Sequence, residues 1–426
     1  MLDFYTENGV CLNMMQGWAG WLLLLFSFSI VLMWKHVRSD TKVVYAIWFC
    51  LVVHHVAVFL NVDIYDAGTF HDHGVNLASL SEPEWPSDFS NCADNYKHFL
   101  GFMYSFSASL FYGKELSVLA FALSCVVLVK LLNLLDLRRF RVRIILLFGL
   151  LPSAVIFRSV TLREPWQALF FLLFVYWTVR LWERPSILIL LFMLMSASCM
   201  ALLHQGLARY AIYLVVFSLY WSIFSCKISV RWARSVKLLF AGLLIACVII
   251  LSQKIGLFMS LGEAVKGGAG LRQTLLTYAD VRTNFSFMLD TSSVLGIVIT
   301  VPMVFVEYMF APFPWQVENA KDVWALLESM LRFVLLFFAV SSWRRSSGKV
   351  RSCYGFLLIA VLGMELVWAL GTANWGTAVR HHIPGYGIIV LLGTPRLVLS
   401  MQKLQFGIFG RGIVSDELNE QSLHKS

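Results

Sequence analysis

Runs of about 20 apolar residues recur along most of this chain, and they limit its fold more than any other feature. One of them, "VVYAIWFCLVVHHVAVFLNV", begins at Val43. Inside a bilayer every backbone polar group needs an internal partner, so such runs form helices. The composition agrees, because 59% of the 426 residues are hydrophobic and only 14% are charged. The sequence therefore predicts an all-α polytopic membrane protein.

These runs predict about eleven full spans. They are residues 17–37, 43–62, 116–135, 144–159, 166–182, 187–203, 210–226, 238–258, 322–341, 353–371 and 385–400. A further apolar run, 292–311, contains Pro302, which lacks the backbone N–H that a helix uses. We expect this run to be a re-entrant or broken segment, and a twelfth full span is the alternative.

The basic residues assign the two sides of the membrane through the positive-inside rule. Four clusters are predicted to be cytoplasmic: "KHVRSDTK" from Lys35, "RRFRVR" from Arg138, "KISVRWARSVK" from Lys227 and "WRRSSGKVR" from Trp343. The N-terminus is then outside, and so is the loop that follows residue 62, because residues 43–96 include seven acids and no Lys or Arg. A full span at 292–311 would place the last basic cluster outside, which favours the re-entrant interpretation.

We expect one integral-membrane domain over residues 1–400 and a cytoplasmic tail over 401–426. Two large outer loops, 63–115 and 259–291, interrupt the spans. The second half of the first loop, "NYKHFLGFMYSFSASLFYG", is amphipathic and aromatic, as is typical of a helix on the membrane surface. Eight cysteines are present, and a disulfide between Cys11 and Cys92, both predicted outside, is an open alternative.

The predicted outer segments carry more charge and more histidine than simple connectors need. The residues concerned are Asp63, Asp66, His71, Asp72, Arg158, Arg163, Glu164, His204, Arg209, Arg272, Asp280, Arg282, Arg380, His381 and His382. Arginine pairs with phosphate oxygens through its planar fork, and a nearby carboxylate can act as a general base. Together they predict a site for a lipid-linked phosphorylated substrate at the outer leaflet.

Simpler roles are open for single members of this set. An arginine at a span end, such as Arg158 or Arg209, often only anchors the helix at the membrane surface. His54, His55 and Glu365 fall inside predicted spans, where both functional roles and hydrogen bonds between helices occur. We therefore leave these three outside the predicted site.

Four motifs place acids, aromatic residues and arginines near the outer ends of spans. They are "DIYDAGTFH" from Asp63, the spacing from Tyr104 to Gly113, "LREPWQALFFLLFVYW" from Leu162, and the late pair "APFPWQVEN" and "NWGTAVRHHIPGYG". This pattern resembles the integral-membrane glycosyltransferases of the C superfamily, in particular bacterial O-antigen and surface-polysaccharide polymerases. The chain differs in that its acidic loop follows the second predicted span, and in that His382 stands where a second late arginine is expected.

The resemblance implies sugar transfer from a polyprenyl (di)phosphate to a hydroxyl of a second lipid-linked glycan. Asp66 would be the base, with Asp63 and Asp72 as alternates, and His71 would orient the acceptor. Glu164 would orient Arg163. The implied set for binding the lipid diphosphate is Arg158, Arg163, Glu164, Arg209, Arg282, Arg380, His381 and His382.

The expected partners are the lipid-linked glycans, the bilayer of the bacterial inner membrane and other polysaccharide-assembly membrane proteins. No nucleic acid is expected, because the basic clusters lie in short loops between spans. No cofactor is required, but a divalent cation at Asp63 and Asp66 is an open alternative. Two other functions are open: a flippase for lipid-linked oligosaccharide, and a membrane acyltransferase that uses "HDH" from His71.

Overall fold

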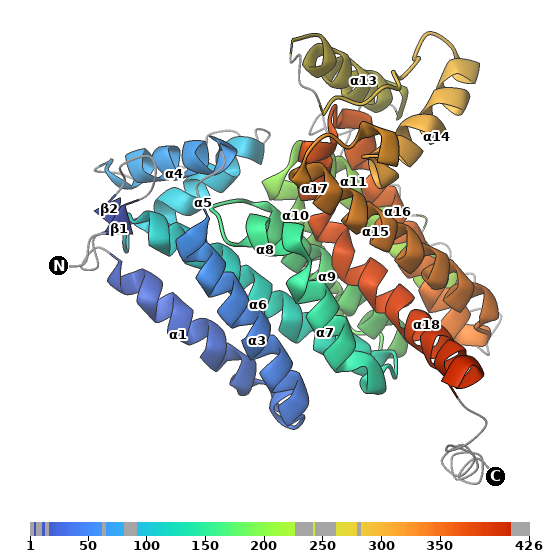
Figure 1. Cartoon of the computed structure of the whole chain (residues 1–426), viewed down its shortest axis with the longest axis horizontal. Helices are drawn as coiled ribbons and strands as arrows, with labels where there is room; N and C mark the ends of the chain where they lie inside the picture. The colour runs from blue at the N-terminus through green and yellow to red at the C-terminus, as the bar shows by residue number, and fades with distance from the viewer. Residues whose placement is uncertain are drawn as a thin grey trace.

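The computed structural model of this protein describes residues 4–5, 11–12, 17–61, 65–80, 92–225, 242, 261–278 and 283–409. This part of the chain is a bundle of helices (Figure 1). Two short strands, β1 (Phe4–Tyr5) and β2 (Cys11–Leu12), pair in antiparallel fashion near the N-terminus.

The helices up to residue 225 include both long and short elements. They are α1 (Trp18–Met33), α2 (Lys35–Arg38), α3 (Thr41–Leu60), α4 (Tyr65–Ala78), α5 (Cys92–Tyr104), α6 (Leu110–Leu134), the 3-10 helix η1 (Arg138–Phe140), α7 (Arg141–Leu150), α8 (Pro152–Arg158), α9 (Glu164–Glu183), α10 (Ile187–Leu203) and α11 (Gln205–Ser225). The later elements are α13 (Leu261–Tyr278), α14 (Val294–Phe310), the 3-10 helix η2 (Pro314–Gln316), α15 (Ala320–Arg345), α16 (Gly348–Gly371), α17 (Trp375–His381) and α18 (Ile383–Phe409).

Among the described residues, five helices are long and apolar enough to cross a membrane, or six if the bent pair α7 and α8 counts as one span. The five are α3, α6, α15, α16 and α18. Three shorter apolar helices, α1, α10 and α14, accompany them. The predicted run 166–182 lies in α9 and the run 210–226 overlaps α11, helices of 20 and 21 residues. The run 238–258 lies outside the described residues except for residue 242. The structure is thus that of a helical membrane protein.

The structure corrects the predicted location of the broken segment. The run 144–159, predicted as one full span, is divided between α7 and α8, which meet at an angle of 63°. Leu151 has extended backbone there, and Pro152 starts the new helix at the first-turn position, where its missing N–H costs nothing. In contrast, α14 continues through Pro302 without a break.

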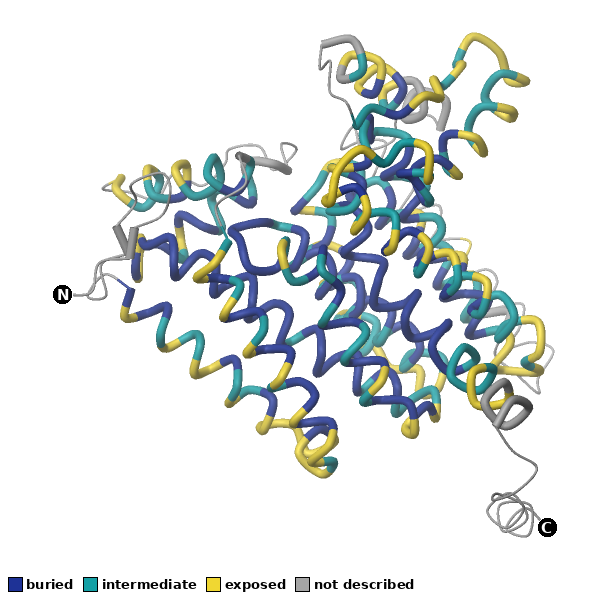
Figure 2. Tube along the Cα trace, in the orientation of Figure 1, coloured by how far each residue is buried: buried dark blue, intermediate teal, exposed yellow. Residues whose placement is uncertain are grey.

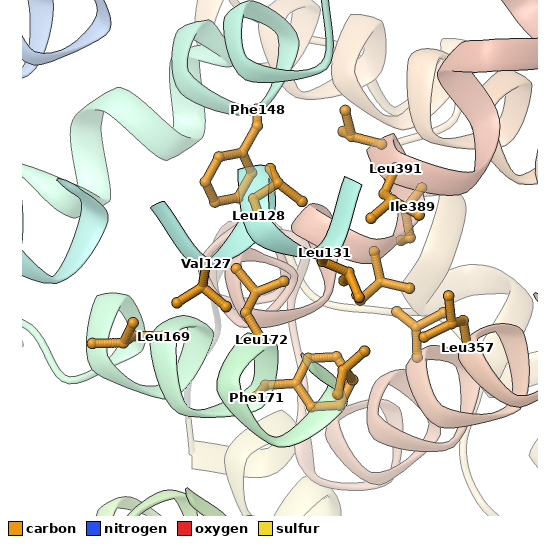
Figure 3. Packing of buried hydrophobic residues seen from close by; sticks show 14 of the residues in the cluster. Val127, Leu128, Leu131, Phe148, Leu169, Phe171, Leu172, Leu357, Ile389 and Leu391 are labelled. Atoms are coloured by element: carbon orange, nitrogen blue, oxygen red, sulfur yellow. The ribbon is translucent and has the colours of Figure 1, made fainter. Parts of the chain in front are cut away.

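The core joins both halves of the chain through α6, α9 and α18. Most of α6 is buried, whereas exposed apolar side chains collect on the outward faces of α1, α14 and α15 (Figure 2). In the centre, Leu128 and Leu131 of α6 lie among Leu172 of α9, Leu357 of α16 and Ile389 of α18 (Figure 3). One large apolar cluster thus forms the core of the bundle. Three smaller clusters are separate from it, and two of them pack α4 and α5.

Several short elements meet at one end of this bundle. Helices α4, α5, α13 and α17 lie there, and the C-terminal end of α18 lies at the other end (Figure 1). Helix α4 replaces the loop expected for the first half of 63–115, and α5 confirms a helix in its second half. Two backbone hydrogen bonds, from Phe285 N–H to Ala373 C=O and from Trp375 N–H to Thr283 C=O, join the 259–291 loop to the start of α17.

Candidate functional site

One arginine connects three of the segments that the sequence predicts to be outside. Arg380 of α17 lies 2.5 Å from Asp66 of α4, measured from Nη1 to Oδ2, and 3.1 Å from Glu164 of α9, measured from Nε to Oε1. Asp66 and Glu164 each stand in the first turn of their helix, where a carboxylate is favoured by the helix dipole. Asn374 caps α17 by accepting from Thr377 N–H at 2.8 Å, which fixes the start of the turn that presents Arg380.

The two acids differ in their access to solvent. The Glu164 side chain is 1% exposed and the Arg380 side chain 13%, whereas the Asp66 side chain is 47% exposed. Burial alone would lower the pKa of Arg380, but the neighbouring Glu164 and Asp66 raise it above its ordinary value. Arg380 is therefore a permanent cation with one fixed partner and one partner that an anionic ligand can replace.

Arg163 supplies a second cation beside this group. It precedes the first residue of α9, donates from Nη1 to Leu203 C=O at 3.3 Å, and lies 5.6 Å from the ring centre of Phe70. Arg209, which the sequence also assigns to the site, is half-buried on α11 and forms no ion pair with a residue that the structure describes.

Two histidines pack against the indole of Trp368, next to these arginines. The ring centres of His204 and His381 lie 4.3 Å and 4.1 Å from that of Trp368. Burial, with the charges of Arg163 and Arg380, lowers the pKa of His204 well below its usual range. Burial, then Arg380 and other neighbours including His204 and Arg163, does the same for His381. Both imidazoles are therefore neutral at physiological pH.

His71 and Asp72 have separate positions on α4. His71 lies 2.9 Å from the Tyr104 hydroxyl, measured from Nδ1, and that hydroxyl rests against the α-carbon of Gly113, where any larger residue would collide with it. This contact explains the predicted spacing from Tyr104 to Gly113. Asp72 is exposed and forms no ion pair with Arg380. Asp63 and Arg282 lie outside the described residues, as do the side chains of Cys11 and Cys92.

Arg158, predicted as a phosphate ligand, lies in the core instead. It is 1% exposed, donates from Nη1 to Phe148 C=O at 3.0 Å, and lies between the rings of Phe121 and Phe148. Arg158 is the last residue of α8, which is bent by 63° from α7.

His382 also lies apart from Arg380, in a sealed network that the sequence analysis missed. Its Nε2 lies 2.7 Å from Arg332 Nη1, and its Nδ1 lies 2.6 Å from Glu365 Oε2. Tyr308 donates to the same Glu365 oxygen at 3.1 Å, and Arg332 donates to Tyr386 at 3.3 Å. The signal was present in the sequence: Glu328 and Arg332 are four residues apart inside the apolar run 322–341 and so share one helix face.

Within the described part of the chain, no three His, Cys, Asp or Glu side chains are grouped to hold a metal ion. Comparison with protein-family models, curated proteins and solved structures gives no match for this chain. The chemistry of the site is therefore read from its side chains: two guanidinium groups, two carboxylates and two neutral imidazoles, with Asp66 as the exposed member.

Proposed function

We propose that the protein is a membrane glycosyltransferase of the polymerase type, which joins polyprenyl-(di)phosphate-linked sugars or repeat units in surface-polysaccharide (O-antigen type) biosynthesis. The observation that carries this proposal is the Asp66–Arg380–Glu164 contact, since it unites three segments that are far apart in the chain. In this contact Glu164 holds Arg380 from one side, and Asp66 on the other side is a carboxylate that a ligand can replace.

A diphosphate fits this arrangement better than a neutral ligand does. The guanidinium fork matches two phosphate oxygens, and Glu164 holds the Nε side of Arg380 while its Nη1 points to Asp66. A phosphate that binds at Nη1 takes the place of Asp66. Arg163, beside the same group, adds the second positive charge that a diphosphate needs.

In the proposed reaction the hydroxyl oxygen of the acceptor attacks the anomeric carbon of the donor sugar. The bond from that carbon to the phosphate oxygen breaks, and the electron pair leaves with the diphosphate. Arg380 and Arg163 stabilise the negative charge that develops there, an effect worth about 10²–10³ in rate for one well-placed donor. Asp66, released from Arg380, is the proton acceptor that the sequence analysis predicts, and His71 orients the acceptor.

The membrane arrangement is part of the same proposal. A fold like that of the C-superfamily glycosyltransferases, with about eleven spans, would place the N-terminus outside the inner membrane and the C-terminus in the cytoplasm. Support comes from the position of α4, α5, α13 and α17 at one end of the bundle and of the end of α18 at the other (Figure 1). Other polysaccharide-assembly proteins are proposed neighbours in the membrane.

The test is the length distribution of surface glycan in a deletion strain that carries wild type, Arg380→Lys, Asp66→Asn or the control Asp72→Asn. All variants are compared at equal amounts in the membrane. We expect single repeat units with Arg380→Lys, and long chains with Asp72→Asn, because that side chain is exposed and forms no ion pair with Arg380. Single repeat units with Asp66→Asn would identify Asp66 as the base of the reaction. Long chains with both site variants would contradict the proposal.

A flippase for lipid-linked oligosaccharide is the second candidate. The observation that favours it is the buried charge inside α15 and α16, where Glu328, Arg332 and Glu365 are each less than 5% exposed. Intramembrane charges of this kind are frequent in transporters. With a flippase, loss of function would remove all surface glycan and leave lipid-linked units on the cytoplasmic side, whereas loss of a polymerase leaves single units on the surface.

A further inference from the structure

The hydrogen bonds of His204 and His381 determine which nitrogen of each ring carries the proton. Gly206 N–H donates to His204 Nδ1 at 3.0 Å, so Nδ1 is unprotonated and the neutral ring has its proton on Nε2. For His381, the partner of Nδ1 is the Thr372 hydroxyl at 2.9 Å. That hydroxyl already donates to Trp368 C=O at 2.7 Å, so it can only accept from His381.

The Nε2 atoms of the two rings therefore differ in protonation. His381 has its proton on Nδ1 and an unprotonated Nε2, while His204 has an N–H at Nε2. Neither Nε2 forms a hydrogen bond with a residue that the structure describes. His381 stacks on Trp368 with the ring planes 20° apart, and His204 packs against the same indole at a tilt of 53°. The site thus holds one proton acceptor and one proton donor next to Arg163 and Arg380.

We propose that His381 Nε2, rather than Asp66, takes the proton of the attacking hydroxyl. The inference rests on the proposed glycosyl transfer and names its base. The diphosphate displaces Asp66 from Arg380, but the released carboxylate is half-exposed to water. The His381 ring, in contrast, is held by Thr372 and Trp368 with the lone pair of Nε2 available. His204 Nε2–H is placed to donate to a second oxygen of the same substrate.

The donor lipid controls this base through the charges around it. The groups that face the His381 ring are Arg380, His204, Arg163 and His382. Two of them are cations, which disfavour a third positive charge on the imidazole. A bound diphosphate replaces Asp66 at Arg380 and brings more negative charge than that carboxylate, so the imidazole gains proton affinity when the donor is in place. The site is thus inactive toward hydroxyl groups until the donor lipid has bound.

The proposed step balances in atoms and electrons. The O–H bond of the acceptor breaks and its proton moves to His381 Nε2, while the oxygen forms a bond to the anomeric carbon. The electron pair of the broken carbon–oxygen bond stays on the diphosphate. The proton then passes from the imidazolium to the diphosphate, which has gained negative charge, and His381 returns to its neutral form.

The test uses His381→Asn, in which the amide nitrogen can replace Nδ1 as donor to Thr372 but nothing replaces Nε2. Binding of undecaprenyl diphosphate is measured from the thermal stabilisation of the full-length protein in detergent. Elongation is measured in liposomes with lipid-linked repeat units extracted from the deletion strain. We expect binding equal to wild type and a loss of elongation on the order of 10²–10⁴-fold.

The pH profile separates a proton acceptor from a structural residue. With donor bound, the added negative charge raises the pKa of His381 from its lowered value. Wild-type elongation therefore falls at acidic pH, because protonated imidazole accepts no proton. The residual elongation of His381→Asn should not change with pH. A wild-type rate for His381→Asn, with Arg380→Lys still inactive, would overturn His381 as the base and leave the glycosyltransferase proposal standing. Full elongation by both variants would overturn both.

Discussion

Arg380 and Arg332 each join side chains from several helices, and they differ in whether a partner can leave. Arg380 contacts Glu164 and the half-exposed Asp66. Arg332 is 1% exposed, and its partners are buried as well. A ligand from solvent can compete for the first arginine but cannot reach the second. The candidate site is therefore the one in which Arg380 has a half-exposed partner. The fully buried partners of Arg332 instead hold the helices together.

The difference extends to the adjacent histidines, His381 and His382. Arg332 has no acceptor, so His382 Nε2 must accept from it at 2.7 Å. The proton of His382 is then on Nδ1, which donates to Glu365 at 2.6 Å. Both nitrogens of His382 form hydrogen bonds, whereas Nε2 of His381 has no partner among the described residues. Two consecutive residues with the same side chain thus have different chemistry because of what surrounds them.

The largest expected effect is the loss of Arg332. Arg332→Met removes the donor to Met309 C=O, His382 and Tyr386. Each buried acceptor that is left without a partner costs about 1–3 kcal/mol of folding free energy. Thermal unfolding in detergent measures it, with the exposed Arg344→Met as the control. The double variant Arg332→Met/Glu365→Gln should recover part of the loss. A single variant as stable as wild type would contradict the role of this network.

Arg380→Lys should reduce elongation on the order of a hundredfold with a smaller effect on unfolding. Lysine keeps a positive charge near Glu164, but it lacks the planar fork that matches two phosphate oxygens. Elongation in liposomes and thermal unfolding, measured on one preparation, separate the two effects. If unfolding changes as much as it does for Arg332→Met, the distinction between the two arginines fails.

Acid should weaken the folded state through the histidines that are held neutral. The pKa values of His204, His381 and His382 are lowered in the folded protein, so the unfolded chain binds more protons below about pH 6.5. Stability then falls as the pH decreases, by about 1.4 kcal/mol per pH unit for each such histidine. Unfolding between about pH 7 and pH 5 tests this. His381→Asn should make the decline shallower, whereas the exposed His73→Gln should not.

The smallest effect is expected for Asp66→Asn on binding. Asp66 competes with the diphosphate for Arg380, but its side chain is 47% exposed, so the pair contributes only about 0–1 kcal/mol. Its loss should leave unfolding nearly unchanged and tighten undecaprenyl diphosphate binding by no more than about fivefold. Weaker binding by this variant would show that Asp66 contacts the ligand directly instead of competing with it.

The sequence predicted the meeting of Asp66, Glu164 and Arg380 because each stands at the end of an apolar run. Span ends on one side of a membrane lie near one plane, so hydropathy and charge already bring such residues close. Arg158 was predicted to join them for the same reason. It does not, because a 63° bend separates α7 from α8. The sequence alone does not predict this bend, because a proline such as Pro152 is compatible with the start of a new helix as well as with one continuous span.

The buried network around Arg332 could not be predicted from the sequence for a different reason. The sequence shows Glu328, Arg332 and Glu365 in apolar runs, but the partners come from α14, α16 and α18. Which of these helices meet depends on side-chain packing throughout the core, and hydropathy carries no information about it. The protonation of His204 and His381 likewise depends on Gly206 N–H and the Thr372 hydroxyl, contacts that exist only once the helix ends are in place.

Three consecutive residues at the end of α17 contact three separate sets of partners. Arg380 contacts Asp66 and Glu164, and His381 contacts Thr372 and Trp368. His382, the C-cap of the helix, contacts Arg332 and Glu365. Neighbouring side chains on a helix point about 100° apart. An inserted or deleted residue between the Asn374 cap and Arg380 would rotate all three onto the wrong partners. Evolution can therefore exchange many residues around this turn, but relatives of this chain should keep its length unchanged.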